Sequence, residues 1–225
     1  MEKLLVKKIF ICLTITIVFP LIAASPKYIF LFIGDGMGVP QIALASEYAK
    51  GNLSLNTLPV VGITTTRSLN HFITDSAAAG TALASGEKTN SGMIGMTPDG
   101  KILKACTVNA AHHNKKIGIV TSVSLDHATP AAFYAHVSNR NHYYDIACQM
   151  AKSNIDYLAG GGLLQPQGED GKLPDALALA QQNNYIISRT LKEFNELKPG
   201  PKAIALAPNP TNQASLQYEI DQKYS

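Results

Sequence analysis

The feature that most constrains the fold of this chain is a regular alternation of short apolar runs with longer segments of helical pattern. The clearest apolar run covers residues 28–33 and ends at Gly34. A continuous run of this kind is typical of a strand that is covered on both faces. Because the alternation continues along the chain, the sequence predicts an α/β fold with a three-layer, largely parallel central sheet and helices on both faces.

Strand patterns recur at 60–66, 116–123, 155–159, 185–188 and 203–207, and helical patterns at 40–50, 75–85, 103–113, 142–153, 174–183 and 191–197. The run at 116–123 is predicted to be a second buried strand, and 160–162 is a glycine turn. In open parallel sheets, ligands bind beside the carboxyl ends of the strands. The segments that follow strands are therefore the first places to search for a site.

Residues 1–24 have the pattern of a secretory signal peptide, which leaves 25–225 as a single domain. Three lysines precede an apolar run at 9–24, and small residues follow at the expected cleavage point. The alternative is an uncleaved membrane anchor, but the run is short for a span. We expect an exported protein, periplasmic or secreted, without a stable membrane anchor.

Charge and cysteine content exclude or favour further classes. The formal net charge is +3, and removal of three Lys and one Glu with residues 1–24 leaves a nearly neutral chain. No nucleic-acid partner is therefore expected. Cys106 and Cys148 lie in predicted helices, where a disulfide is allowed in an oxidising compartment. Buried free thiols are the favoured interpretation.

The first candidate site is the sequence Gly-Asp-Gly-Met-Gly at 34–38, between a predicted strand and a helix. A dinucleotide fingerprint needs a third glycine where Val39 stands, and the Gly-Lys-Ser/Thr ending of a P-loop is missing. What remains is Asp35 flanked by glycines, which suits a divalent cation. A tight turn with a solvated carboxylate is the alternative.

The second candidate is the run Thr-Asp-Ser-Ala-Ala-Ala-Gly-Thr-Ala at 74–82. It places Ser76 at the start of a small-residue helix, where backbone N–H groups and a partial positive charge favour a phosphoryl group. The flanking glycines of a serine-hydrolase elbow are absent, so a metal ion is the expected activator of the hydroxyl. An ordinary helix N-cap is the alternative.

The third candidate follows the predicted strand at 116–123. His127 and Thr129 alternate, so in an extended stretch they would face the same side and could hold a metal. Arg140 offers a planar guanidinium suited to phosphate. The alternatives are that Asp126 only caps a turn, that His136 is a satisfied core histidine, and that Arg140 is a surface residue.

Several of these motifs together resemble the alkaline phosphatases. The matching stretches are Gly-Asp-Gly-Met-Gly at 34–38, Thr-Asp-Ser-Ala at 74–77, His-Ala-Thr-Pro at 127–130 and Asn-Arg-Asn at 139–141, with further likeness at 86–95 and 159–162. The resemblance extends from about residue 27 to the end of the chain. It implies an alkaline phosphatase-like sheet and a phosphomonoester hydrolase that works through a phosphoserine intermediate.

The resemblance also implies roles for single residues. Asp35 corresponds to the carboxylate that bridges magnesium and one zinc, and Ser76 to the nucleophile that also contacts this zinc. Thr129 and His127 correspond to positions at the magnesium, and Arg140 to the arginine that binds two phosphate oxygens. Zn²⁺ and Mg²⁺ are the implied cofactors, phosphate monoesters the substrates, and a homodimer the implied assembly.

One departure limits these expectations. The family's remaining metal ligands include three histidines from the C-terminal half of a longer chain, whereas none of the six histidines here lies within 143–225. We therefore expect an incomplete sheet and a truncated chain with little or no phosphatase activity alone. The alternatives are a non-catalytic phosphate- or metal-binding remnant and a related phosphodiesterase-type hydrolase. A sulfatase is disfavoured because the Cys/Ser-x-Pro-x-Arg context is absent around Ser76.

Overall fold

The computed structural model describes residues 26–51, 53–198 and 200–217, and these fall into two units, with the second beginning at Met37. The predicted signal peptide at 1–24 lies outside the described residues. Each unit is described by itself. The first contains the apolar run at 28–33, and the second contains all the assigned helices and strands.

The strand predicted at 28–33 is not formed. The rings of alternate residues contact one another along this segment, with centroids 6.5 Å apart for the tilted pair Tyr28 and Phe30 and 6.4 Å apart for the stacked pair Phe30 and Phe32. These side chains are nonetheless exposed, by 89% for Phe32. A strand exists only through hydrogen bonds to a neighbour, and the described part of this unit contains no second strand. Apolar character alone was therefore not sufficient to predict a strand at 28–33.

The strand predicted at 60–66 is also absent. Its apolar side chains are exposed, and no ladder is assigned along it. The end of this segment is held by a single lysine instead, because Lys88 Nζ donates hydrogen bonds to the carbonyls of Thr65 and Arg67 at 3.3 and 2.5 Å. The prediction of a strand was wrong at this point for the same reason as at 28–33.

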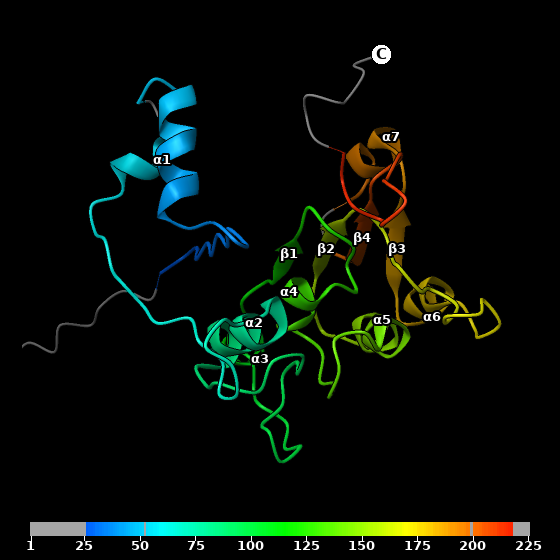
Figure 1. Ribbon diagram of the computed structural model, residues 1–225. Helices are drawn as coiled ribbons and strands as arrows, with labels where there is room; N and C mark the ends of the chain where they lie inside the picture. The colour runs from blue at the N-terminus through cyan, green and yellow to red at the C-terminus, as the bar shows by residue number, and fades with distance from the viewer. Residues whose placement is uncertain (1–25, 52, 199, 218–225) are drawn as a thin grey trace, which may run out of the picture. The chain divides into compact units, whose positions relative to one another are not determined.

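The second unit contains a parallel sheet of four strands in the order β1-β2-β4-β3, shown side by side in Figure 1. The strands are β1 (Gly118–Val120), β2 (Tyr157–Gly160), β3 (Tyr185–Ser188) and β4 (Lys202–Leu206). Parallel pairing places Ile119 opposite Leu158, Leu158 opposite Ile204 and Ile204 opposite Ile187. The predicted α/β class with a largely parallel sheet is confirmed.

Strand β1 lies at one end of this sheet, which corrects the prediction of a buried strand at 116–123. Gly118 and Val120 are exposed, the latter by 73%. An end strand has a neighbour on one side only, so alternate residues can remain in contact with solvent. Apolar content indicated a strand correctly but did not determine its place in the sheet.

The predicted helices are formed with slightly shorter bounds: α1 (Val39–Tyr48), α2 (Ser76–Ser85), α3 (Cys106–His112), α5 (Tyr143–Ala151), α6 (Ala176–Gln182) and α7 (Leu191–Asn195). Local signals explain these bounds, because Pro40 occupies the first turn of α1 and Asp75, Asp175 and Thr190 cap α2, α6 and α7 with their side chains. Two short elements were not predicted, η1 (Ser54–Thr57) and α4 (Ala128–Ala131).

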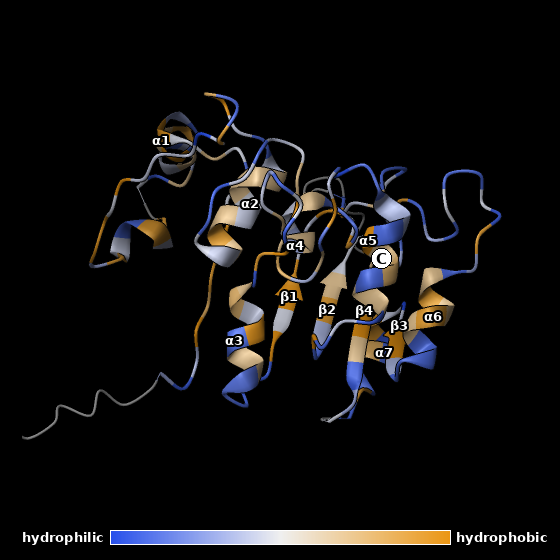
Figure 2. Cartoon of the chain, turned by 90° about the horizontal axis from the view of Figure 1, so that it is seen from below, coloured by the Kyte–Doolittle hydropathy of each residue, from blue (hydrophilic) through white to orange (hydrophobic). Residues whose placement is uncertain are grey.

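Two apolar clusters form the core of the second unit. One joins α2 and α4 and includes Ala77, Ile94, Ala128, Val137 and Ile146. The other lies against the sheet and includes Leu125, Met150, Leu158, Tyr185 and Ile204. Helix α5 contributes Ile146 to the first and Met150 to the second, so it links them. It packs beside α6 in Figure 1, and Figure 2 shows hydrophobic residues concentrated in the strands.

Both cysteines outside the predicted signal peptide are free thiols, as expected. Neither is buried, however, because Cys106 is exposed and Cys148 is half-buried. The prediction of buried thiols was therefore wrong on burial, since both sit on helix faces turned partly to solvent. Within the described ranges, the helices are too short or too polar to cross a bilayer.

Candidate functional site

The N-terminus of α2 resolves which residue caps the helix. Asp75 has extended backbone angles, and its Oδ1 accepts a hydrogen bond from the Ala78 N–H at 3.0 Å. Asp75 is therefore the N-cap, and Ser76 is the first residue of the helix. Because the capping role is filled by the aspartate, the alternative interpretation of Ser76 as the N-cap is wrong.

Close packing between α2 and α4 fixes the position of α4, which contains Thr129, relative to the N-terminus of α2. A Cβ on Gly80 would lie 3.0 Å from the Cβ of Ala132 and 3.7 Å from the carbonyl oxygen of Thr129. A larger residue at position 80 would have to push the two helices apart. The small residues of α2 therefore serve to bring α4, with Thr129, against the helix that begins at Ser76.

The arrangement of His127 and Thr129 differs from the prediction. They were expected in an extended stretch with both side chains on one side, but α4 begins at Ala128. His127 is its N-terminal flanking residue, and Thr129 lies within the helix, half-buried. Successive helical residues point in directions about 100° apart, so the alternation argument does not apply to them.

Arg140 joins the N-terminus of α2 through Asp75. Its Nη1 donates to Asp75 Oδ2 at 3.1 Å, and the two side chains are only 23% and 25% exposed. Its Nη2 lies 3.4 Å from His127 Nε2. Arg140 is thus held between two elements rather than free in solvent, and its interpretation as an ordinary surface residue is wrong. The structure brings Arg140, His127 and Asp75, the neighbour of Ser76, into one cluster.

The ionisation of Asp75 follows from these contacts. Burial alone would raise the pKa of this carboxyl, but hydrogen bonds from the amides of Ala78 and Gly92 and the charge of Arg140 outweigh burial. The pKa of Asp75 is therefore held below its ordinary value. At neutral pH the carboxylate is charged, and it orients the Arg140 guanidinium through Nη1.

A second carboxylate, Asp126, lies fully buried in the loop after β1. Its oxygens accept hydrogen bonds from the amides of Leu164, at 2.8 and 3.1 Å, and Gln165, at 3.2 Å. These partners are distant in sequence, so Asp126 ties two loops together and is more than a turn cap. Burial raises the pKa of Asp126 despite these hydrogen bonds.

Asp35 belongs to the first unit, where it is exposed at the turn after residues 28–33. In the second unit, the expected ligands Ser76, Thr129 and His127 offer two hydroxyls and one imidazole. Across the described residues, no group of three or more His, Cys, Asp or Glu side chains is placed to hold a metal ion. A zinc ion needs three or four nitrogen, sulfur or carboxylate ligands, so these residues do not fit a zinc centre by themselves.

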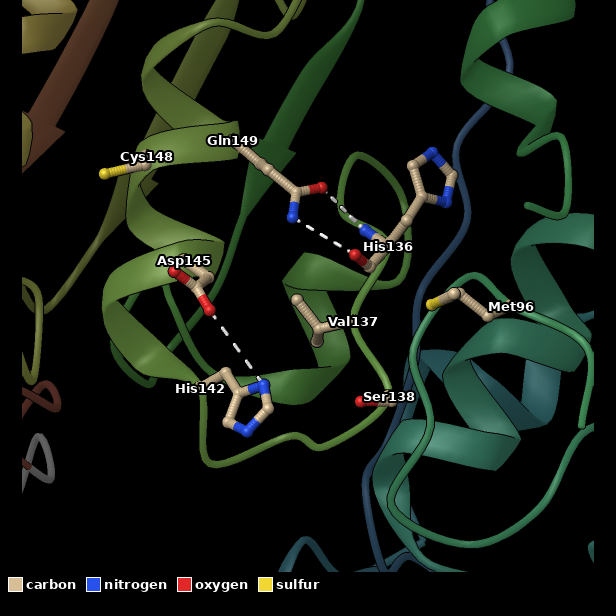
Figure 3. Close-up of a pocket in the computed structure, with 8 residues that line it drawn as sticks. All are labelled: Met96, His136, Val137, Ser138, His142, Asp145, Cys148 and Gln149. Atoms are coloured by element: carbon tan, nitrogen blue, oxygen red, sulfur yellow. Dashed lines mark hydrogen bonds and ion pairs between the residues drawn. The ribbon is translucent and has the colours of Figure 1, made fainter. Parts of the chain in front are cut away.

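A pocket of about 430 Å³ lies beside α5, and Arg140 is not among its lining residues. Figure 3 shows the eight residues that line it. Gln149 Oε1 accepts a hydrogen bond from the His136 N–H, and Gln149 Nε2 donates one to the His136 carbonyl. His142 Nδ1 lies 3.9 Å from Asp145 Oδ2. His136 Nδ1 lies 2.8 Å from the Gly95 carbonyl, so the expected hydrogen-bond partner is confirmed, but the residue is half-buried and is not a core histidine. His136 is thus one lining residue of a pocket that does not include Arg140, Asp75 or His127.

Two members of the cluster were missed by sequence reasoning. Asp75 was considered as a cap and not as the partner of Arg140, and Gly92, whose amide also reaches Asp75 at 3.1 Å, was not singled out. The signal for Asp75 was its position directly before Ser76. The signal for Gly92 was the turn-forming Asn-Ser-Gly at 90–92 within the stretch 86–95.

Comparisons with known proteins agree on one family. The family model "Alkaline phosphatase" matches residues 26–160. The chain is 37% identical over 185 residues to alkaline phosphatase 4 of Bacillus subtilis, covering 76% of this chain and 40% of that protein. It is 33% identical to the alkaline phosphatase structure from the Antarctic bacterium TAB5, with a TM-score of 0.73 over 81% of this chain and 53% of that one. A His-to-Glu mutant of the TAB5 enzyme, with Mg bound in its M3 site, superposes with a TM-score of 0.74 at 32% identity, over 84% of this chain and 54% of the mutant chain. The chain thus spans 40% of the length of the curated relative.

Proposed function

Because this chain belongs to the alkaline phosphatase family, we propose that its second unit carries the phosphate-binding and phosphoryl-accepting part of a phosphomonoester hydrolase. The observation that carries this proposal is the contact between Arg140 and Asp75. It fixes a guanidinium next to the residue that directly precedes Ser76, at the N-terminus of a ten-residue helix. A cation and a hydroxyl at a helix N-terminus suit a phosphate dianion.

The reaction that we propose has two displacement steps. Ser76 Oγ attacks phosphorus, so that an O–P bond forms to serine while the ester P–O bond breaks and the leaving alcohol takes up the proton that the Ser76 hydroxyl gives up. Water then attacks the phosphoserine, the bond between Ser76 Oγ and phosphorus breaks to release inorganic phosphate, and one proton of the water passes to Ser76 Oγ. Arg140 supplies charge-assisted hydrogen bonds to the phosphoryl oxygens in both steps, and the first-turn amides of α2 add donors.

Asp75 has two opposing effects on this binding. It orients Arg140 through the 3.1 Å contact, but its negative charge lies close to the place where the phosphate dianion would bind. Since one of its oxygens is engaged by Ala78 and the other by Gly92 and Arg140, the carboxylate is kept in a fixed direction. Asp75 therefore fixes the direction of the Arg140 guanidinium, although its negative charge lowers the net positive charge available to a phosphate.

Magnesium and zinc are the cofactors that we propose for the complete reaction, with Asp35, Ser76, Thr129 and His127 as candidate ligands. The support is family membership and the Mg named for the TAB5 mutant. When bound, these ions would supply charge for the phosphoryl group and its leaving oxygen. The described residues of the second unit do not form a complete metal site by themselves. We also propose that the protein is exported and forms a homodimer.

The experiment starts from binding of inorganic phosphate to the full 225-residue chain, measured by calorimetry. We expect Arg140→Ala to abolish measurable binding, whereas Arg189→Ala, which removes an exposed arginine elsewhere, leaves it unchanged. Ser76→Ala is expected to retain binding but to lose the acid-stable phosphoserine formed with a labelled monoester. Absence of phosphate binding by the unsubstituted chain would overturn the proposal.

Labelling with two kinds of substrate separates a monoesterase, a diesterase and a non-catalytic phosphate-binding remnant. Labelling of Ser76 by a phosphate monoester and not by a diester supports the monoesterase assignment, and the reverse preference favours a diesterase. Phosphate binding that depends on Arg140, without phosphoserine in the presence of added Mg²⁺ and Zn²⁺, would identify a non-catalytic phosphate-binding remnant and overturn the proposed chemistry.

A further inference from the structure

Gly92 contacts both residues of the Arg140–Asp75 pair. Its amide donates to Asp75 Oδ2 at 3.1 Å, the same oxygen that accepts from Arg140 Nη1. Its carbonyl accepts from the backbone N–H of Arg140 at 2.7 Å. One residue therefore fixes the arginine at its main chain and, through the carboxylate, at its guanidinium.

The backbone around Gly92 forms a turn in which one residue must adopt the left-handed conformation, with a positive φ. Met93 N–H donates to the Asn90 carbonyl at 3.2 Å, which closes a four-residue turn with Gly92 at its third position. Gly92 has a φ of 86°, as in turns that require glycine at this place. A Cβ added to Gly92 would meet no atom within 4 Å. The requirement for glycine is thus one of backbone angle and not of space.

Neighbouring contacts hold this turn in place on both sides. Ser91 N–H donates to Asn70 Oδ1 at 2.8 Å, and the hydroxyls of Ser91 and Ser68 lie 3.0 Å apart. Beyond the turn, Ile94 and Val137 exchange two backbone hydrogen bonds of 2.9 and 3.0 Å. The segment that leads to Arg140 is therefore hydrogen-bonded to the segment that follows the turn. The contact between Gly92 and Arg140 continues this pairing.

We propose that Gly92 is a positioning residue for the phosphate-binding arginine, because its left-handed conformation allows one peptide amide and one carbonyl to hold Asp75 and Arg140 together. This inference rests on the proposed function of Arg140. A residue that resists a positive φ would rotate the turn, withdraw the amide from Asp75 and loosen the guanidinium without filling any cavity.

The structure offers a closely matched control. Gly100 also has a φ of 86°, and the space around it is open, since no atom lies within 4 Å of a Cβ added at this position. It closes the turn that starts at Thr97, whose carbonyl accepts the Gly100 N–H at 2.9 Å. Gly92→Ala and Gly100→Ala therefore both place an alanine at a φ of 86°, and only the first acts on the Arg140 contacts.

The experiment measures the affinity of the full-length chain for inorganic phosphate by calorimetry, together with the melting temperature of each variant. We expect Gly92→Ala to weaken phosphate binding about tenfold, or about 1.4 kcal/mol, while Gly100→Ala leaves it within twofold and lowers the melting temperature by a similar amount. Gly92→Asn should recover part of the affinity, because Asn tolerates positive φ better than Ala.

A second readout follows Arg140 directly through ¹⁵N relaxation of its Nε–H group, which we expect to become more mobile in Gly92→Ala and not in Gly100→Ala. Equal loss of affinity in both alanine variants, or an unchanged Arg140 signal in Gly92→Ala, would overturn the inference. If the unsubstituted chain binds no phosphate, the proposed function fails instead, and the relaxation comparison still decides whether Gly92 positions Arg140.

Discussion

The N-terminus of α2 and the loop after β1 each contain a carboxylate that accepts several hydrogen bonds, yet the two behave in opposite ways. Asp75 accepts from the amides of Ala78 and Gly92 and from Arg140, and its pKa is lowered. Asp126 accepts from the amides of Leu164 and Gln165, and its pKa is raised. The number of amide donors is similar, so it does not explain the difference.

Different burial and the Arg140 guanidinium explain why the pKa of Asp75 is lowered and that of Asp126 is raised. Asp126 is fully buried, whereas the side chain of Asp75 is 25% exposed and faces a cation. Loss of solvation penalises a charged carboxylate, and a nearby opposite charge offsets that penalty. Asp126 therefore acts as a structural acceptor between two loops, while Asp75 remains ionised and orients a group that can bind a ligand.

The largest effect on stability is expected at Asp126. Asp126→Ala removes the acceptors of two backbone amides and leaves a cavity, so the free energy of unfolding should fall by about 3 kcal/mol. Asp126→Asn keeps one acceptor oxygen and the shape, and should cost on the order of 1 kcal/mol. Urea unfolding measures both. Equal losses for the two variants would show that charge, and not hydrogen bonding, is what the fold requires at this position.

A smaller effect is expected at Asp75, with Asp175 as the matched control. Both cap a helix with the side chain, Asp175 accepting from the Leu177 N–H at 2.7 Å. Each Asp→Ala change should lower the free energy of unfolding by about 1 kcal/mol through loss of the cap. Only Asp75→Ala should also weaken phosphate binding, on the order of fivefold or about 1 kcal/mol. A similar loss of phosphate affinity in Asp175→Ala would contradict the role of Asp75 in orienting Arg140.

The same contrast shows how far the sequence could lead. The helix caps at Asp75, Asp175 and Thr190 are local, because each side chain reaches an amide two or three residues away. Helix positions were therefore predictable. Strands at 28–33 and 60–66 were predicted from apolar content and did not form, since pairing depends on partners elsewhere in the chain. The four strands that do form were all predicted, but their order in the sheet was not.

The site was predictable only in part for the same reason. Family motifs predicted roles for Ser76 and Arg140, and in the structure Arg140 contacts Asp75, the neighbour of Ser76, across 65 positions of sequence. No local pattern shows that Asp126 would reach Leu164, or that Gly92 would hold Arg140. Residue type indicates what a side chain can do, whereas its partner follows from long-range packing.

The two carboxylates should impose opposite pH dependences on stability. The folded pKa of Asp75 lies below 3.8, so its stabilising contribution is present above pH 3.8 and is lost as the pH falls toward the folded value. The folded pKa of Asp126 lies above 3.8, so ionisation destabilises the fold as the pH rises from 3.8 through the folded value. Unfolding free energies measured at about pH 3 to 6 should show a weaker acid loss in Asp75→Asn and a weaker decline at rising pH in Asp126→Asn. Parallel curves for both variants would contradict the comparison.

The smallest expected effect tests the cation itself. Arg140→Gln removes the positive charge but leaves the Ala78 and Gly92 amides in place, so the pKa of Asp75 should rise toward its ordinary value. Carboxyl ¹³C chemical shifts followed through an acid titration measure this pKa, and Arg189→Gln, at an exposed position, should leave it unchanged. If the pKa of Asp75 does not move in Arg140→Gln, the two amides and partial solvent exposure suffice to keep it ionised. The difference from Asp126 would then be one of burial alone, and the guanidinium would be oriented by the carboxylate without stabilising its charge in return.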